Sequence, residues 1–295
     1  LAGHLGCDRS TIHRYLQEIE LRTELQRDSL KRYHVDPAQY VSSVRLTTAE
    51  ALTIYNALRR FIRQTSKAPS FFVSAIKKIA VALGHADLTD QLAESSILME
   101  AERSAAQDHA VIWNAIISAW MEQRVVELTY QKNRSDSFDE HRFEPYLFEP
   151  AVLSHGVYVI GWSQTRGQIR TFKMDRILRV SPTQDHFERR HQIKVDDLLR
   201  HAWSVWYGEE LVRVELRFAP QVARRVMETL WHPSQQTELL KDGSLLWSVE
   251  IAGVLELIPW IRGWGHEVEV LAPESLRAEI GKSLRAAAEL YKEAF

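Results

Sequence analysis

The chain shows two kinds of hydrophobic periodicity, one typical of helices and one typical of strands. In its first part, apolar residues recur at spacings of three and four, which predicts amphipathic helices at 47–64, 70–83 and 108–123. Thr47 and Glu50 form a capping box at the start of the first of these helices. The residues expected to be buried on the three helices are Leu52, Tyr55, Leu58, Ile62, Phe72, Ile76, Ile79, Leu83, Ile112, Ile116 and Trp120.

After the third helix the apolar period changes to two, which predicts short strands. The first strand is expected at 126–130, and three further runs follow at 143–147, 156–162 and 168–177. Because turn residues separate these closely spaced runs, the sequence predicts a small β-barrel. The stretch from Ser181 to about Tyr207 is highly charged and is expected to be a linker.

The last part of the chain has the pattern of a separate α+β domain. Residues 212–218 alternate between apolar and charged side chains, which predicts a strand, and further strands are expected near 245–251 and 268–271. This order is compatible with a split βαβ arrangement. The helices expected between and after these strands lie at 220–231, around 257–261 and at 274–292.

The first residues, 1–36, are expected to form a helix, a tight turn, a second helix and a polar hairpin. Asp8 is a good N-cap for the second helix, because its carboxylate can accept from the unpaired amides of the first turn. Ile12, Leu16 and Ile19 fall on one face of that helix. The opposite, polar face presents Ser10, His13, Arg14 and Gln17, with Thr11 at its edge.

Charge and cysteine content limit the class of protein. The chain has 37 basic and 39 acidic residues, so no global basic field attracts nucleic acid, and any DNA contact would depend on charges local to one face. The single cysteine, Cys7, excludes an internal disulfide framework and fits a reducing compartment. The chain contains no apolar run of membrane-spanning length and does not open with a secretory signal. We therefore expect a cytoplasmic protein without a membrane partner.

Patterns that indicate catalysis or a metal are missing from the sequence. The histidines have no paired spacing suited to a metal, and a lone cysteine offers no thiolate cluster. Ser154 and His155 precede a glycine, but there is neither a Gly-x-Ser-x-Gly elbow nor a glycine-rich phosphate loop. We therefore expect no enzymatic activity, no cofactor and no metal.

The last strand-like run of the predicted barrel carries Arg170, Lys173 and Arg176 among aromatic and aliphatic residues. Strand alternation puts Arg170 on a face with large apolar residues and Lys173 on the opposite face. A guanidinium beside apolar residues is partly desolvated, so it needs an anionic partner. Asp175 or Glu144 could provide a purely structural ion pair. Alternatively, an anionic ligand that contains a base could bind there, because cations and aromatic faces supply charge and stacking together.

This part of the chain resembles the WYL domain, a small β-barrel found mostly in bacterial transcriptional regulators. The resemblance rests on the strand at 156–162 and on the pattern Arg-x-Phe-x-x-Asp-Arg-Ile at 170–177; the namesake tripeptide aligns with 157–159, where only the tyrosine is retained. In that family the counterpart positions contribute to a pocket that senses nucleotides or nucleic acid fragments, although aromatic residues at such positions are more often barrel core. The ligand-binding residues that the resemblance implies are Tyr130, Tyr158, Arg170, Phe172, Lys173 and Arg176.

The N-terminal residues are similar to the winged helix-turn-helix of DeoR-like regulators, through the pattern Leu-Ala-x-x-Leu-Gly-x-x-x-Ser-Thr-Ile-x-Arg-x-Leu at 1–16. In such a motif the second helix lies in the major groove and the wing follows the flanking backbone. Because the chain begins at Leu1, inside the expected first helix, we expect the motif to be N-terminally incomplete. The alternative is a structural two-helix corner with a polar outer face. The implied DNA-contacting residues are Arg9, Ser10, Thr11, His13, Arg14 and Gln17 of the second helix and Arg27, Lys31 and Arg32 of the wing.

The end of the chain resembles the WCX-type extension that often follows a WYL domain, through Trp-Ile-x-x-x-Gly at 260–265 and Pro-Glu-Ser-Leu-Arg at 273–277. A surplus of large apolar residues around so small a module indicates self-association, so a homodimer is expected. The tryptophans that cluster here, as core or interface anchors, are Trp203, Trp206, Trp231, Trp247, Trp260 and Trp264.

These features together predict an α+β multidomain chain. Its expected parts are a truncated winged helix-turn-helix at 1–40, a helical linker at 41–107, a small Sm-like β-barrel of the WYL type at 108–205 and a ferredoxin-like α+β domain of the WCX type at 206–295. The expected function is a ligand-responsive transcriptional regulator that binds double-stranded operator DNA and senses a nucleotide or single-stranded nucleic acid. Two alternatives stay open: a nucleic-acid-binding effector of a partner nuclease or helicase, and a protein-interaction scaffold without a ligand.

Overall fold

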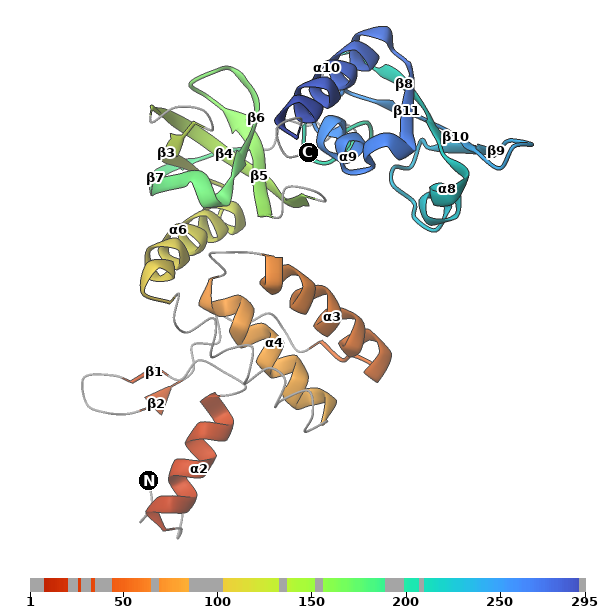
Figure 1. Ribbon diagram of the computed structural model, residues 1–295. Coiled ribbons are helices and arrows are strands. Elements are labelled where there is room, and N and C mark those ends of the chain that lie inside the picture. Colours follow the sequence, from red (N-terminus) through yellow and green to blue (C-terminus); the bar gives the residue numbers. More distant parts are fainter. Residues whose placement is uncertain are drawn as a thin grey trace. The chain divides into compact units, whose positions relative to one another are not determined.

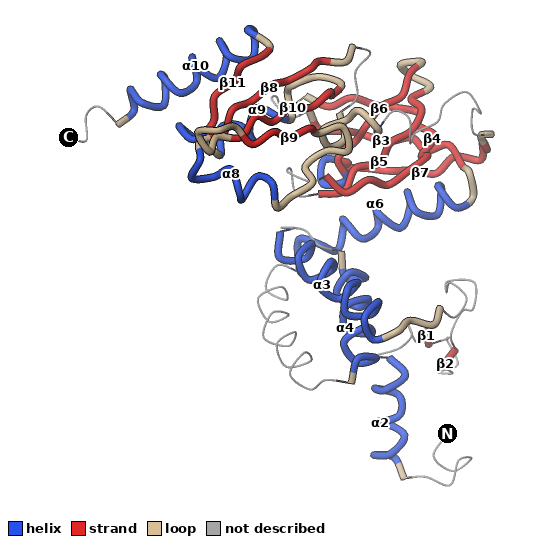
Figure 2. Tube along the Cα trace, turned by 90° about the vertical axis from the view of Figure 1, so that its right-hand side faces the viewer, coloured by secondary structure: helices blue, strands red, loops and turns tan. Residues whose placement is uncertain are grey.

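The computed structural model forms two compact units, Leu1–Asn114 and Ala115–Phe295, each of which is described by itself (Figures 1 and 2). Helices and antiparallel sheets make up the described part of the chain, which confirms the predicted α+β class. The structure describes residues 8–20, 26–27, 33–34, 44–64, 69–84, 103–132, 137–151, 156–188, 199–206 and 210–291.

The first unit contains helices and one short hairpin. Its α3 begins at the predicted capping box, since the Thr47 amide donates to the Glu50 carboxylate at 2.7 Å and the Glu50 amide donates to the Thr47 hydroxyl at 3.3 Å. Its α4 ends at Leu83, as predicted, and the C-cap residue Gly84 takes the left-handed conformation that favours glycine, with φ +69°. The elements are α2 (Arg9–Glu20), β1 (Gln26–Arg27), β2 (Tyr33–His34), α3 (Thr48–Gln64), α4 (Ser70–Leu83) and the start of α6 (Arg103–Met121).

The core between α3 and α4 is built around Tyr55 and Ile62. One predicted member of the buried face was wrong: Leu52 is 43% exposed, and Ala51 is buried in its place. At 100° per residue, Ala51 lies inside the arc formed by Tyr55, Leu58 and Ile62, whereas Leu52 lies beyond its edge. The buried arc is therefore narrower at its N-terminal end than the side-chain sizes suggest.

In the second unit α6 leads directly into five antiparallel strands, in the order β6-β5-β4-β3-β7. β6 and β7 lie at opposite edges, yet only the short 3₁₀ helix η2 (Met174–Arg176) joins them. A flat sheet would separate these edges by about 19 Å, but the chain from Lys173 to Ile177 spans at most about 14 Å. The sheet must therefore curl. The strands are β3 (Arg124–Gln131), β4 (Phe138–Ala151), β5 (Gly156–Ser163), β6 (Gln168–Lys173) and β7 (Ile177–His186).

Two predictions on this sheet were wrong. The run at 168–177 is not continuous, because η2 interrupts it, and Arg176 therefore lies on a turn and not on a strand. Residues 181–186 belong to β7 and not to a linker. β7 pairs with β3 through its backbone while most of its side chains are exposed, so no apolar alternation indicates it in the sequence.

Aromatic rings from strands that are not neighbours fill the inside of the curled sheet. The ring of Phe172 on β6 lies 4.8 Å from the ring of Tyr130 on β3 and 5.0 Å from the ring of Phe143 on β4. The backbone amide of Lys173 donates to the Tyr130 hydroxyl at 3.3 Å. Because β4 and β5 lie between β3 and β6 in the pairing order, these contacts hold the sheet in its curled form.

The curl has a local cause where β5 pairs with β4. The pairing of the two strands shifts between Pro145 and Leu147, which is the position of a β-bulge. Nearby, β5 carries Gly161, and a Cβ at this position would lie 1.9 Å from the carbonyl oxygen of Glu144. Only glycine allows the two backbones to approach so closely.

The C-terminal part of the second unit is a four-stranded antiparallel sheet in the order β11-β8-β10-β9, with helices between its strands. The short strand β9 was not predicted, because all four of its residues are exposed. α8 ends at Met227 and is shorter than expected. The elements are β8 (Val212–Phe218), α8 (Pro220–Met227), β9 (Gln236–Leu239), β10 (Leu245–Ile251), α9 (Leu257–Gly263), β11 (Val268–Ala272) and α10 (Glu274–Leu290).

Indole rings dominate the core of this part. The ring of Trp260 lies 5.2 Å from Trp203, 5.0 Å from Trp231 and 5.3 Å from Trp247. Trp203 belongs to residues 199–206, which precede the first strand of the sheet. The backbone amides of Ser204, Val205 and Trp206 donate to the Glu256 carboxylate at 3.0, 3.1 and 3.0 Å, which fixes this segment to the start of α9.

Candidate nucleic-acid interface

Four of the six predicted ligand residues lie on β6 and η2. Phe172 is 3% exposed and belongs to the core. Lys173 Nζ lies 3.6 Å from Asp175 Oδ2, and a Cβ at Gly156 would meet the Lys173 side chain at 2.6 Å, so the lysine lies directly over this glycine. Arg170 is exposed and Arg176 is half-buried, and neither makes a hydrogen bond or an ion pair with a residue that the structure describes.

The carboxylates that could have paired with Arg170 have other partners. Asp175 pairs with Lys173. Glu144 is 3% exposed and accepts from the Tyr146 hydroxyl at 2.7 Å and from the Gln164 amide at 2.9 Å. Arg170 is exposed, so water solvates its guanidinium, and the expectation that it is desolvated and needs an ion-pair partner was wrong. Its donors are accessible to an anion from outside the chain.

The two predicted tyrosines have different surroundings. Tyr130 is half-buried inside the curled sheet, where its ring contacts Phe172 and its hydroxyl accepts from the Lys173 amide. Tyr158 is half-buried on β5 and lies opposite Lys173 in the strand register. The structure thus brings Tyr130, Phe172 and Arg170 to the inner face of the sheet, whereas Lys173, three residues after Arg170, lies on the other face of β6.

Three charged residues that the sequence did not indicate lie beside this inner face, where the β3–β4 and β5–β6 hairpins meet. Asp139 of β4 binds Lys132 Nζ through Oδ1 at 3.0 Å and Arg166 Nη2 through Oδ2 at 3.5 Å. The hydrogen bond from Lys132 is the main cause that lowers the pKa of Asp139. Because the residues come from two hairpins, only the strand order, and not the local sequence, brings them together.

His141 lies at the centre of this group. Its Nδ1 lies 3.0 Å from the Ser163 hydroxyl, and its ring lies 4.8 Å from Phe172. Burial lowers the pKa of His141, and the nearby Asp139 carboxylate partly opposes this effect. The three cations that lower the pKa of His141 further are Arg166, Arg170 and Lys132. One carboxylate and three cations thus surround a neutral imidazole.

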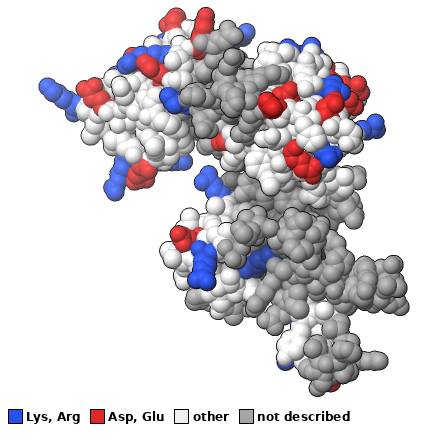
Figure 3. Space-filling model, turned by 180° about the vertical axis from the view of Figure 1, so that it is seen from behind, with Lys and Arg blue, Asp and Glu red and all other residues white. Residues whose placement is uncertain are grey.

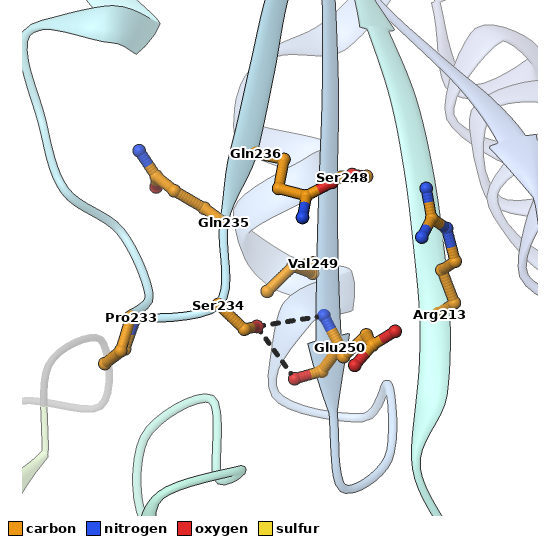
Figure 4. A pocket seen from close by; sticks show the side chains of 8 residues that line it. All are labelled: Arg213, Pro233, Ser234, Gln235, Gln236, Ser248, Val249 and Glu250. Atoms are coloured by element: carbon orange, nitrogen blue, oxygen red, sulfur yellow. Dashed lines mark hydrogen bonds between the residues drawn. The ribbon is translucent and has the colours of Figure 1, made fainter.

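Two pockets in the second unit are balanced in charge. A pocket of about 530 Å³ at β3, β4 and β7 is lined by Arg142, Arg179, Glu127 and Glu140 and also by His141, whereas none of the six predicted ligand residues lines it. A second pocket, of about 280 Å³, lies in the C-terminal part between β8, β9 and β10 (Figure 4). Charges of both signs are also interspersed on the face drawn in Figure 3.

The second pocket is lined by groups that already bind one another. The Ser234 hydroxyl accepts from the Glu250 amide and donates to the Glu250 carbonyl, both at 3.0 Å (Figure 4). Arg213 donates to Glu215 at 2.9 Å. These pockets therefore offer an anion less net positive charge than the group of Lys132, Arg166 and Arg170 with Asp139.

The predicted DNA-contacting residues are only partly described. Asp8 caps α2 as predicted, since its carboxylate accepts from the Thr11 amide at 2.8 Å and from the Ser10 hydroxyl at 2.6 Å, and these bonds lower the pKa of Asp8. Ser10, His13 and Arg14 are exposed, and Thr11 is half-buried. The side chains of Arg9, Gln17, Arg27, Lys31 and Arg32 lie outside the described residues. β1 and β2 form an antiparallel hairpin where the wing is expected.

Within the described ranges, no group of three or more His, Cys, Asp or Glu side chains could hold a metal ion. None of the described helices is both long enough and apolar enough to span a bilayer. Cys7, Ser154 and His155 lie outside the described residues.

Comparison with known domains identifies the two parts of the second unit. Residues 111–182 match the WYL domain, and residues 210–288 match the WCX domain. The chain carries a WYL domain and a WCX domain. The resemblance of these regions is therefore confirmed. The predicted ligand residues that lie inside the WYL domain include Arg170 and Arg176, and the cluster around Asp139 lies there too.

Similar whole proteins are known as well. Protein PafC of Mycobacterium tuberculosis is 26% identical over 256 residues, which cover 85% of this chain and 73% of that protein. Protein PafC of Mycobacterium leprae is 24% identical over 260 residues, covering 84% and 74%. Among solved structures, proteasome accessory factor B/C of Arthrobacter aurescens is 20% identical with a TM-score of 0.33, and this chain spans 45% of its length. A CRISPR Cas-related protein is 10% identical with a TM-score of 0.48.

We expect His141 to titrate below its ordinary pKa of 6.5. Because folding favours the neutral ring, the unfolded chain binds more protons than the folded chain below that value, so this histidine lowers the free energy of unfolding as the pH falls from 6.5 towards the folded-state pKa. The measurement is an NMR titration of the histidine ring protons, with His141→Asn to assign the signal. A His141 pKa at or above 6.5 would contradict the described burial and charges.

Proposed function

We propose that the protein is a DNA-binding transcriptional regulator whose WYL domain senses a nucleotide or a single-stranded nucleic acid. The WYL and WCX domains support this proposal, as does the similarity to PafC, which extends over more residues than the two domain matches together. The strand orders of the two sheets are those of an Sm-like barrel and of a ferredoxin-like domain, which supports these finer fold assignments.

One observation carries the sensing part: Arg170 and Arg176 have no partner among the described residues. Some other arginines of the same unit do have one, although Arg179 and Arg285 do not. Arg142 binds Glu127 at 3.2 Å and Arg277 binds Glu269 at 2.8 Å. Unpaired guanidinium groups beside aromatic rings fit the phosphates and bases of a nucleic acid ligand.

The DNA-binding part rests on α2 and the β1–β2 hairpin. The helix exposes Ser10, His13 and Arg14 on one side, while Ile12 and Leu16 are partly buried on the other. This is the arrangement that a recognition helix needs, because polar side chains must reach base edges and phosphates while apolar ones hold the helix to its domain. The hairpin that follows has the place of a wing.

We propose that the regulator works in the cytoplasm as a homodimer on double-stranded operator DNA, with the WCX domain as the dimerisation module. A ligand on the WYL domain would change DNA occupancy only if it bound two dimer arrangements with different affinity. We propose no catalytic activity. Of the hydroxyl–imidazole pairs in the described residues, His141 and Ser163 are both buried, and the Ser234 hydroxyl, 2.8 Å from His232, already bonds to the backbone of Glu250.

For the sensor, we expect Arg170→Ala and Arg176→Ala each to weaken the binding of a labelled oligothymidylate of about twelve nucleotides. Each lost phosphate contact should reduce the slope of log affinity against log salt by about 0.7. The measurement is fluorescence anisotropy over a range of salt concentrations. The matched control is Arg224→Ala, which removes an equal charge from a side chain that is 91% exposed in the WCX domain. Unchanged affinity and slope in both sensor variants would refute the proposed sensing.

For DNA binding, we expect Arg14→Ala to weaken binding of a mixed-sequence duplex and to make the salt slope shallower by about 0.9, the value for one phosphate of double-stranded DNA. A loss that is similar for every duplex sequence would indicate a phosphate contact, and a loss that depends on the sequence would indicate a guanine contact. An electrophoretic shift assay at several salt concentrations measures both quantities. A slope equal to that of Arg224→Ala would count against α2 as the DNA-contacting helix.

A further inference from the structure

We infer that Lys132 and Arg166, held on either side of the Asp139 carboxylate, form a second phosphate-binding position of the WYL domain, next to Arg170. This inference rests on the proposed function, since it takes the ligand to be a single-stranded nucleic acid. It adds residues from the ends of two hairpins to those of β6 and η2.

The charges at this position do not cancel. Asp139 is the one carboxylate bound to both cations, and it shares its two oxygens between Lys132 and Arg166. Arg170 adds a third positive charge that has no partner among the described residues. These four groups carry a net charge of about +2, which an anion with at least two negative charges can neutralise. Consecutive phosphates of one strand supply such charges at a regular spacing.

The two cations are exposed enough to bind a ligand. The side chains of Lys132 and Arg166 are 47% and 48% exposed, whereas that of Asp139 is 28% exposed. The carboxylate therefore lies beneath the ammonium and guanidinium groups. Each cation keeps donors that Asp139 does not use, because a lysine has three and an arginine has five.

The backbone holds Arg166 in place before any ligand binds. The amides of Arg166 and Gly167 donate to the Ser163 carbonyl at 3.2 and 2.8 Å, and the Ser163 hydroxyl also lies 3.0 Å from His141. Gly167 has φ +64°, the left-handed conformation that this tight turn requires. A turn fixed in this way loses little conformational entropy when the ligand binds.

Surface ion pairs alone would explain this cluster differently. An exposed pair contributes on the order of 0–1 kcal/mol, so Lys132, Asp139 and Arg166 could simply stabilise the two hairpins. The two explanations differ in what they predict for Asp139. If the cations bind phosphate, replacing Asp139 raises the local positive charge and does not weaken oligonucleotide binding. If the cluster only stabilises the hairpins, replacing Asp139 weakens oligonucleotide binding as much as replacing Lys132 or Arg166.

The experiment measures anisotropy of the labelled oligothymidylate with Lys132→Ala, Arg166→Ala, Arg166→Lys and Asp139→Asn in the full chain. We expect the two alanine variants each to lose roughly three- to fivefold in affinity at physiological salt and about 0.7 of the salt slope. Arg166→Lys should retain the slope, and Asp139→Asn should bind at least as tightly as the native chain. Thermal unfolding of each variant provides the folding control, and Arg224→Ala provides the charge control.

The outcomes separate this inference from the proposed function. If Arg170→Ala weakens binding but Lys132→Ala and Arg166→Ala do not, the second position is refuted while the sensor remains. If Asp139→Asn weakens binding as much as the alanine variants, the cluster is structural and the inference fails. If Lys132→Ala and Arg166→Ala weaken binding and Arg170→Ala does not, the second position stands and the role of Arg170 is refuted. If the native chain binds no oligonucleotide, both are refuted.

Discussion

The curl of the WYL sheet is the constraint on which the candidate site depends. Phe172 on β6 can contact Tyr130 on β3 only because the sheet bends through the two strands between them. The bond from the Lys173 amide to the Tyr130 hydroxyl holds β6 in this position, and the short η2 joins the two edge strands. In a flat sheet Arg170 would lie far from the β3–β4 hairpin, and its charge would not reach His141.

Given this curl, the chemistry of the inner face follows from the balance of its charges. Burial among the core rings lowers the pKa of His141, and the charged groups that act on it are the carboxylate of Asp139 and the cations Lys132, Arg166 and Arg170. Elsewhere in the unit the arginines Arg142, Arg217 and Arg277 each bind a carboxylate of their own. The net charge of the chain, −2, gives no sign of the positive charge gathered at the site.

The local parts of the structure could be predicted from the sequence, and the non-local parts could not. The caps at Asp8 and Thr47 involve residues within one turn, so their pattern is visible in the chain. β7 and β9 were missed because backbone pairing, not buried side chains, makes them strands. The candidate site likewise has a local part that the sequence predicts and a non-local part that it does not. The β6 cations were found from their own strand, but the pairing of Asp139 with Arg166 depends on the strand order.

The most direct test of a phosphate-binding inner face is the pKa of His141, measured by NMR without and with a saturating single-stranded oligonucleotide. Lys132, Arg166 and Arg170 lower this pKa in the free protein. Phosphates bound to these cations would compensate them, so the account predicts that the pKa of His141 rises when the oligonucleotide binds. An oligonucleotide that binds and leaves the pKa of His141 unchanged would show that the strand lies elsewhere.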